Sequence, residues 1–132
     1  MKKNVLFLFV AITLLFTACQ KEQSEQENPN VSKLIGVWVE THYWDSPNND
    51  WHTWGFISGF VHEFREDKTY IEYSSLTNYN NGTPFNSPKS YTFDGEYLVI
   101  DGGFKEKIIF SEDGNKLIWE NEAKCNRYSP NK

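Results

Sequence analysis

Histidine and carboxylate side chains are the groups in this chain best suited to metal binding or acid–base chemistry. His42, His52 and His62 are spaced ten residues apart, and no cysteine or carboxylate stands at metal-ligand spacing from them. The carboxylates gather at turns, as in Glu66-Asp67 and Glu112-Asp113, where they serve turn geometry and solubility. The chain also has no nucleophile elbow and no glycine-rich phosphate loop. The sequence therefore predicts no metal, no cofactor and no catalytic residue, and it favours a protein that is not an enzyme.

Aromatic residues form the most informative cluster. Five of them fall within the fourteen residues 43–56, and these are Tyr43, Trp44, Trp51, Trp54 and Phe56. A flexible loop rarely exposes so much aromatic area without a use. Two interpretations stay open, a lid packed on one end of the domain as part of its core, or a platform that grips a ligand. The same loop carries Asn48, Asn49 and Asp50, which are suited to hydrogen-bond hydroxyl groups.

The N-terminus has the pattern of an export signal. Met1-Lys2-Lys3 precedes the twelve-residue apolar run Val5–Phe16, which is shorter than the roughly 20 residues of a spanning helix. Phe16-Thr17-Ala18-Cys19 then resembles a lipobox, with Phe16 where that motif usually has leucine. We therefore expect residues 1–18 to be a lipoprotein signal peptide, and Cys19 to be the lipidated residue. The alternative is an ordinary secretory signal with Cys19 as a bystander.

The resemblance to a lipobox implies a durable membrane tether. Bacterial lipoprotein cysteines carry a diacylglyceryl group and usually a third acyl chain, such as palmitate, and two or more chains hold a protein stably on a bilayer. Residues 19–30 are then a polar, disordered linker. The expected location is the cell envelope, where the protein would be anchored in the outer membrane. Some lipoproteins of this kind are exposed on the cell surface, and that location stays open here. Loss of Lys2 and Lys3 would change the formal net charge from −5 to −7, which argues against nucleic-acid partners.

Residues 31–132 read as a single domain of short β-runs divided by turn signals. Asn81-Gly82, Asp94-Gly95 and Asp113-Gly114 are typical turn dipeptides. The eight runs are 34–42, 60–65, 69–76, 90–93, 97–100, 104–110, 116–120 and 123–128. Such a meander has two reactive edges unless it closes on itself. We therefore predict an all-β fold, an eight-stranded antiparallel up-and-down barrel, with a small β-sandwich as the alternative. With Cys19 lipidated, Cys125 has no internal disulfide partner, and it is either a small buried residue or a thiol that pairs with another chain.

Gly36-Val37-Trp38 at the start of the first run, with Arg127 in the last, resembles the signature of the lipocalin or calycin family. In that family Gly-x-Trp opens the barrel, and an arginine from the final strand packs across the indole and closes the end. Residues 34–128 also resemble the short lipocalin-like domains of envelope lipoproteins, which share segments similar to residues 34–38, 64–70 and 117–119. Two departures are clear, because the second lipocalin motif and the C-terminal helix are missing. Arg127 and Tyr128 are adjacent and point to opposite faces, so they do not form the carboxylate-binding pair of fatty-acid carriers.

The resemblance and the aromatic loop together predict a barrel that binds one small apolar or amphipathic molecule without catalysis. The alternative is a cell-surface module that recognises a protein or a glycan and uses a filled barrel as scaffold. The oligomeric state is left open. The expected ligand-lining residues are Trp44, Trp51, Trp54, Phe60, Phe64, Tyr91, Phe93, Val99 and Trp119.

The lipid anchor can be tested directly at Cys19. Cys19→Ser should leave the precursor unprocessed by the lipoprotein pathway, because the thiol is the group that is acylated. A chain that starts near Val31 should fold alone and need no detergent for extraction, since the polar linker contributes no packed core. Mass spectrometry of the mature N-terminus and membrane fractionation measure both effects. Wild-type protein released by an osmotic wash, with an unmodified N-terminus away from Cys19, would contradict the anchor.

Overall fold

A computed structural model describes residues 27–55 and 59–130. Cys19 and the predicted signal peptide lie outside these residues, as does Phe56. The strands are β1 (Gly36–Asp45), β2 (Asp50–Thr53), β3 (Val61–Phe64), β4 (Thr69–Tyr73), β5 (Lys89–Phe93), β6 (Tyr97–Ile100), β7 (Glu106–Phe110), β8 (Lys116–Trp119) and β9 (Ala123–Tyr128). Two short helices accompany them, α2 (Val31–Leu34) and α3 (Leu76–Asn80). None of the helices among the described residues is long and apolar enough to cross a membrane.

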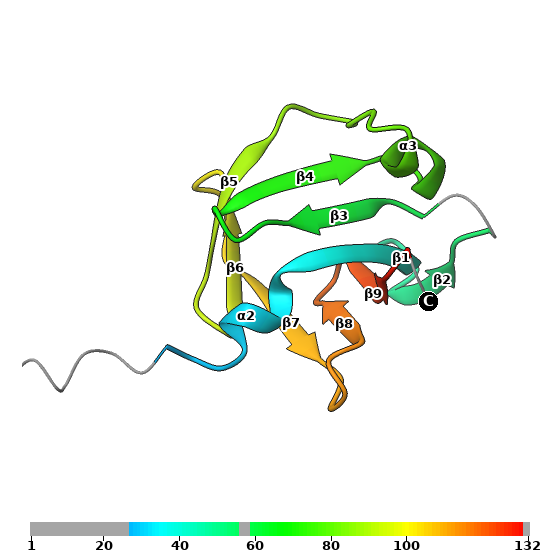
Figure 1. The fold of residues 1–132 in the computed structure, drawn as a ribbon. Helices are drawn as coiled ribbons and strands as arrows, with labels where there is room; N and C mark the ends of the chain where they lie inside the picture. The colour runs from blue at the N-terminus through cyan, green and yellow to red at the C-terminus, as the bar shows by residue number, and fades with distance from the viewer. Residues whose placement is uncertain (1–26, 56–58, 131–132) are drawn as a thin grey trace, which may run out of the picture.

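The strands close into an antiparallel barrel (Figure 1). From β3 onward each strand pairs with the next, β1 pairs with β3, and β9 returns to pair with β1. This last pairing joins Trp38 to Arg127 and removes the two open edges that a meander would otherwise expose. The predicted all-β, eight-stranded up-and-down barrel is thus confirmed, and it consists of β1 and β3 to β9. The sandwich alternative is excluded by the same closure.

The aromatic loop of the sequence is in fact a β-hairpin. β1 runs on to Asp45, and β2 pairs with it so that Trp44 lies opposite Trp51. β3 pairs only with the first half of β1, and β2 takes up the same edge of β1 beyond it. Asn49 turns the hairpin with a positive φ of 52°, which asparagine tolerates better than most residues. The hairpin therefore extends the barrel wall at one end.

Several predicted run ends differ from the observed strands for local reasons. The first strand begins at Gly36, because Val31–Leu34 forms α2. The third predicted run, 69–76, corresponds to β4, which ends at Tyr73. The helix α3 then starts after Ser75, whose hydroxyl accepts a hydrogen bond from the Asn78 backbone N–H. Such side-chain caps stabilise a helix start. The polar residues just before α2 also touch the barrel, since Asn30 Nδ2 donates to the Gly95 carbonyl at 3.4 Å.

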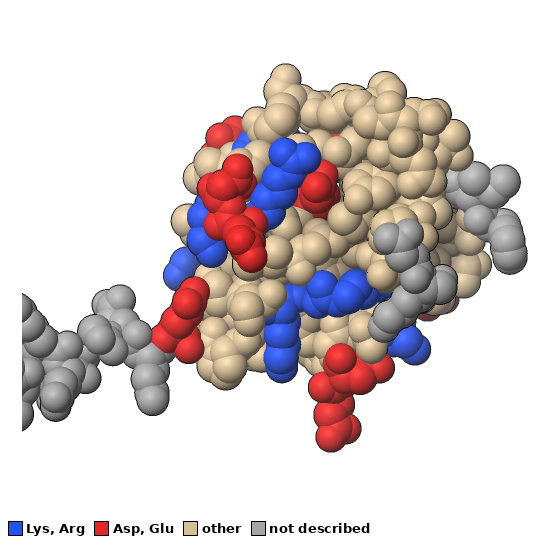
Figure 2. Space-filling model, viewed as in Figure 1, with Lys and Arg blue, Asp and Glu red and all other residues tan. Residues whose placement is uncertain are grey.

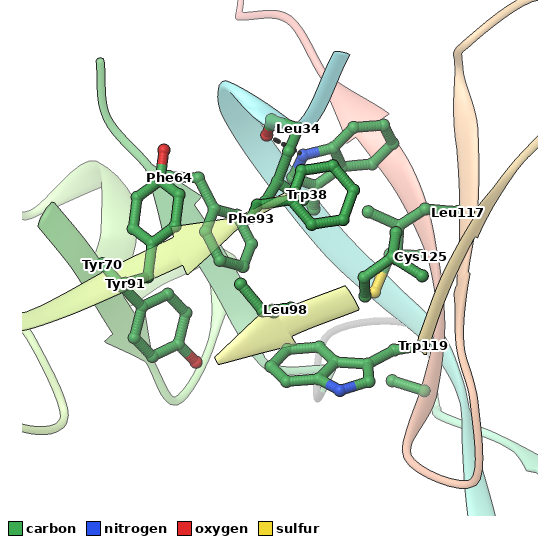
Figure 3. Packing of buried hydrophobic residues seen from close by; sticks show 12 residues of the cluster. Leu34, Trp38, Phe64, Tyr70, Tyr91, Phe93, Leu98, Leu117, Trp119 and Cys125 are labelled. Carbon is green, nitrogen blue, oxygen red and sulfur yellow. Dashed lines mark hydrogen bonds between the residues drawn. The ribbon is translucent and has the colours of Figure 1, made fainter. Parts of the chain in front are cut away.

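The packed core fills the end of the barrel where β1 begins. Alternation along each strand turns every second side chain inward, and rings and aliphatic groups from most of the barrel strands meet there (Figure 3). The core cluster includes Leu34, Trp38, Phe64, Tyr91, Phe93, Leu98, Ile108, Leu117 and Cys125. A smaller cluster lies outside the barrel wall, where Val61, Ile71 and Tyr73 pack beneath Leu76 and Tyr79. The short helix α3 thus covers apolar side chains that point outward from β3 and β4.

Arg127 closes the packed end. Its guanidinium carbon lies 4.2 Å from the centre of the Trp38 ring, a distance typical of a cation–π contact. The same guanidinium donates to the carbonyls of Ile35 at 2.9 Å, Lys33 at 2.6 Å and Gly114 at 3.2 Å. The Trp38 indole N–H in turn donates to the Leu34 carbonyl at 2.9 Å. One side chain therefore fixes α2, the start of β1 and the β7–β8 turn to one another.

Acidic and basic side chains occur in small mixed groups on the face shown in Figure 2. No continuous basic surface is visible on that face.

Gly36→Val is expected to lower the free energy of unfolding by about 1–3 kcal/mol. Gly36 has a φ of +134°, and a Cβ there would come within 2.7 Å of Arg127 Nη1, so the new side chain would be strained and would displace the guanidinium. Urea unfolding measures the loss. Gly82→Val is the control, because Gly82 also has a positive φ of +66° but no atom lies within 4 Å of the position that a Cβ would take there. Equal losses in the two variants would contradict a role for the contact with Arg127.

Candidate ligand-binding site

A cavity of about 310 Å³ lies at the end of the barrel opposite the Arg127 closure. The strands bring both aromatic and ionisable side chains to it, because β1 and β4 place glutamates at inward positions toward this end, β3 places a histidine there, and β8 ends on the inward Trp119. The hairpin of β1 and β2 contributes part of its wall. The lining residues are Glu40, Tyr43, Trp44, Trp54, Phe60, His62, Tyr70, Glu72, Trp119 and Glu122.

A chain of hydrogen bonds crosses the floor of the cavity. The Trp54 indole N–H donates to Glu40 Oε2 at 2.7 Å, and Glu40 Oε1 lies 2.7 Å from His62 Nε2. On the other side of the imidazole, Nδ1 lies 2.8 Å from the Tyr70 hydroxyl oxygen. Tyr70 donates to Glu72 Oε2 at 3.1 Å. These short contacts hold side chains from β1, β3 and β4 and the segment after β2 in fixed positions.

Burial and negative charge set the protonation of the groups around this network. Burial raises the pKa of Tyr70 above the ordinary range of tyrosine, and the charge of Glu72 raises it further. Tyr70 therefore remains a neutral hydrogen-bond donor. Partial burial raises the pKa of Glu122 as well, with a further contribution from the charge of Glu40. Ionised carboxylates in the cavity are thus destabilised by burial and by their mutual repulsion.

Four of the ligand-lining residues expected from the sequence line this cavity, namely Trp44, Trp54, Phe60 and Trp119. Trp51 belongs to the same hairpin but packs edge-on against Trp44, with ring centres 5.1 Å apart. Its other neighbour is Lys124, whose Nζ lies 4.6 Å from the Trp51 ring centre. The Tyr43 and Trp54 rings thus face the cavity together, whereas Trp51 packs with Trp44 on the opposite face of the hairpin.

The other expected lining residues lie elsewhere. Phe64, Tyr91 and Phe93 belong to the packed core cluster, and the Tyr91 hydroxyl donates to the Arg65 carbonyl at 2.7 Å. Val99 follows the buried Leu98 in β6 and so points to the opposite face of the strand. The structure places these side chains away from the cavity.

Sequence reasoning missed the polar half of the lining. Glu40, Tyr70, Glu72 and Glu122 were not singled out, and His62 was considered only with the other two histidines as a metal ligand, a role that the sequence did not support. A signal was present, because Phe60 just before β3 and His62 and Phe64 within it alternate along the chain, and a histidine between two phenylalanines at inward positions marks a polar place in the interior. Glu72, two residues after the inward Tyr70, gives the same signal in β4.

The three histidines do not converge. His62 lies in the cavity network, His52 Nε2 lies 3.3 Å from Asp45 Oδ2 in the hairpin, and His42 Nδ1 lies 2.9 Å from the Thr41 hydroxyl. Across residues 27–55 and 59–130, no group of three or more histidine, cysteine or acidic side chains is arranged to hold a metal ion. Cys125 is buried as a free thiol, and burial raises its pKa well above the ordinary value.

The indole N–H of Trp119 is a buried hydrogen-bond donor without an acceptor. Its indole Nε1 is buried and has no hydrogen-bond partner, the one such side-chain nitrogen or oxygen in the described part of the chain. The nitrogen lies on the ring edge that is turned away from Leu98 and the packed cluster (Figure 3). Burial raises the pKa of nearby Glu106, and the approach of the Trp119 N–H to this carboxyl as a hydrogen-bond donor opposes that shift, but the contact does not meet the distance and angle limits of a hydrogen bond.

A larger depression of about 450 Å³ lies on the barrel wall over β7, β8, β9 and β1. It includes the exposed side chains of Ile109 and Ile118 with Lys116 and Lys124 nearby. The hydrogen bonds of the side chains along it, such as that from the Thr41 hydroxyl to the Lys124 carbonyl, are local ones within the wall. Because ligand sites combine apolar walls with a few polar groups that fix orientation, the smaller cavity is the stronger candidate.

Comparison of the chain with models of protein families, with curated proteins and with solved structures gave no match. The resemblance to lipocalins therefore stays a prediction, and the site is interpreted from its own geometry.

Glu106→Gln is expected to raise the melting temperature at neutral pH. Burial raises the pKa of Glu106 above its ordinary value of 4.5, and the charge of Glu122 adds to this shift. The folded state therefore binds the proton more tightly than the unfolded state, so the wild type loses stability as the pH rises through the interval above about 4.5. Melting curves from acid to neutral pH should show a gain for Glu106→Gln that disappears below about pH 4. A variant less stable than wild type at neutral pH would show that the carboxylate stabilises the fold.

Proposed function

We propose that the domain binds one small amphipathic molecule in the cavity beneath the β1–β2 hairpin and does not act as an enzyme. The observation that carries the proposal is the composition of the cavity. Rings of Tyr43, Trp54 and Phe60 form its apolar walls, and the hydrogen-bonded floor contains Glu40 and His62. A volume of about 310 Å³ is at the small end of the range for ligand sites, so the ligand would be short.

The unequal filling of the barrel supports this proposal. The end closed by Arg127 is packed with rings and aliphatic side chains, whereas the opposite end retains space. The network of Trp54, Glu40, His62 and Tyr70 holds the floor of that space rigid. A preorganised floor lowers the cost of ordering the site when a ligand enters.

We further propose that the domain is a lipoprotein held on a bacterial envelope membrane, in the outer membrane, by acyl chains on Cys19. The chain reaches the barrel through α2, which lies at the end closed by Arg127. A tether that leads from this end would leave the mouth of the cavity facing away from the lipid surface. That arrangement suits a domain that collects a molecule from the surrounding solvent.

A cell-surface module that recognises a protein or a glycan is the second candidate. The depression of about 450 Å³ on the barrel wall favours it, because Ile109 and Ile118 are exposed there beside lysines. In that case the cavity under the hairpin would have no ligand of its own.

Calorimetric titration of the domain with 1-hexanol, a neutral and short amphipathic probe, tests the binding function. Saturable binding is expected for wild type, and Trp54→Ala should weaken it about tenfold because an aromatic wall and a hydrogen bond to Glu40 are both lost. Trp51→Ala is the matched control, since Trp51 lies in the same hairpin but not in the lining, and it should change the affinity less than about twofold.

Two results would contradict the proposal. One is the absence of saturable hexanol binding, together with native mass spectra of the purified domain that show no co-purified small molecule. The other is an equal loss in Trp51→Ala and Trp54→Ala, which would place the probe at the outside of the hairpin.

A further inference from the structure

The lining of the cavity carries more acidic groups than its own basic groups can neutralise. Glu40, Glu72 and Glu122 all line it, and His62 is the only basic side chain that the described residues contribute to the lining. Glu106 lies nearby, and its pKa is raised by burial and then by the charge of Glu122. Lys124, the neighbouring cation on β9, is engaged with the Trp51 ring outside the lining.

The hydrogen bonds show which polar groups of the lining already have partners. Tyr70 donates its hydroxyl proton to Glu72 at 3.1 Å, and the same oxygen lies 2.8 Å from His62 Nδ1. Glu40 receives the Trp54 N–H on one oxygen, and its other oxygen lies 2.7 Å from His62 Nε2. Glu40, Glu72 and both nitrogens of His62 are therefore occupied within the network.

Even with His62 charged, the cavity has a surplus of negative charge. Three carboxylates and one imidazolium leave a formal charge of −2, and a neutral imidazole would leave −3. Glu40 is hydrogen-bonded to Trp54 and His62, and Glu72 is hydrogen-bonded to Tyr70. Among the described residues, no side-chain hydrogen bond or ion pair involves Glu122. Burial and then the charge of Glu40 raise the pKa of Glu122, and the interaction with His62 offsets this shift only in part. A cationic group bound in the cavity would therefore offset negative charge that the side chains of the lining leave uncompensated.

The walls suit an organic cation better than a metal ion. Tyr43 and Trp54 rings lie 4.7 Å apart and the Trp54 and Phe60 rings 5.9 Å apart, which gives a continuous aromatic surface beside the carboxylates. Aromatic faces attract ammonium groups through their quadrupoles, and the attraction grows when water is excluded. The acidic groups are spread around the cavity, and across the described residues none of them form a cluster suited to a metal.

The unpartnered indole N–H of Trp119 adds a second requirement. Trp119 lines the same cavity and is 7% exposed, and its buried Nε1 has no hydrogen-bond partner. A buried donor without an acceptor is costly. An acceptor oxygen on the ligand, such as a hydroxyl or ester oxygen near the ammonium group, would satisfy it.

We infer that the ligand of this cavity is a small organic ammonium ion, with its cationic group held between Glu72 and Glu122 and its carbon skeleton against the Tyr43, Trp54 and Phe60 rings. This inference rests on the proposed binding function and specifies the ligand class for the same site. An apolar molecule with an anionic head group is excluded from the cavity by the same charges.

Three probes of equal chain length test the inference: hexylammonium, 1-hexanol and hexanoate, titrated calorimetrically into the same domain. Hexylammonium should bind about tenfold more tightly than hexanol, and hexanoate should not bind. High salt should weaken the binding of hexylammonium and leave that of hexanol unchanged. Hexanol or hexanoate that binds as tightly as hexylammonium would overturn the cationic ligand and leave the binding function intact. If none of the three binds, the binding function itself fails.

Matched charge variants distinguish the effect of carboxylates in the cavity lining from the effect of the overall negative charge of the protein. Glu122→Gln and Glu72→Gln should each weaken hexylammonium at least about fivefold and leave hexanol within about twofold, since glutamine keeps the shape of glutamate and its amide oxygen can still accept from Tyr70. Glu106→Gln is the control, because it removes the same charge near Glu122 but from outside the lining. An equal loss in all three variants would show that only the overall charge attracts the probe. Melting curves show that each variant is folded in the same buffer.

Discussion

The contact between Arg127 and Trp38 is the constraint on which the rest of the barrel depends. The guanidinium covers the indole and donates to three backbone carbonyls in two separate parts of the chain. It lies in the last strand, so it is placed only when β9 has returned to β1. The close approach is tolerated because Gly36 has no side chain to collide with Arg127 Nη1. Closure of the sheet and sealing of one end are therefore the same event.

Sealing one end lets the two halves of the interior differ. Near Trp38 the inward positions hold large apolar groups, which pack with few polar atoms among them. Toward the hairpin the inward positions hold Glu40, His62 and Glu72, whose desolvation is offset only by mutual hydrogen bonds. A fully apolar end would be the more stable choice for a plain scaffold. The retention of charged groups in the barrel thus favours a binding role over a purely structural one.

The β1–β2 hairpin extends the barrel wall and forms one side of the cavity. It continues the edge of β1 where β3 has ended, and its tryptophans divide their roles. Trp54 faces the cavity beside Tyr43, and the Trp54 N–H also fixes Glu40. Trp51 packs behind Trp44 beneath Lys124. The hairpin is therefore both the side wall of the site and one of the groups that position its floor.

The sequence by itself determined the class of fold and the position of most strands. Turn dipeptides such as Asp94-Gly95 and Asp113-Gly114 are local signals, and alternation along a strand is local too. Where local signals compete, the prediction failed: residues 43–54 contain turn formers and aromatics together, and only their pairing across β1 and β2 shows that they form a hairpin. The same limit applies to Ser75, which caps α3 only because the chain leaves β4 there.

The candidate site was predictable only in its aromatic half. Trp44, Trp54, Phe60 and Trp119 are recognisable as unusual by residue type alone, whereas glutamate is common on every surface and draws no attention. Whether Glu40, Glu72 and Glu122 point to solvent or into one cavity depends on strand register, because a shift of one residue moves a side chain to the opposite face. The tertiary structure decided the site for this reason: residues up to eighty-two positions apart in the chain meet only when the barrel closes, and no local pattern encodes that distance.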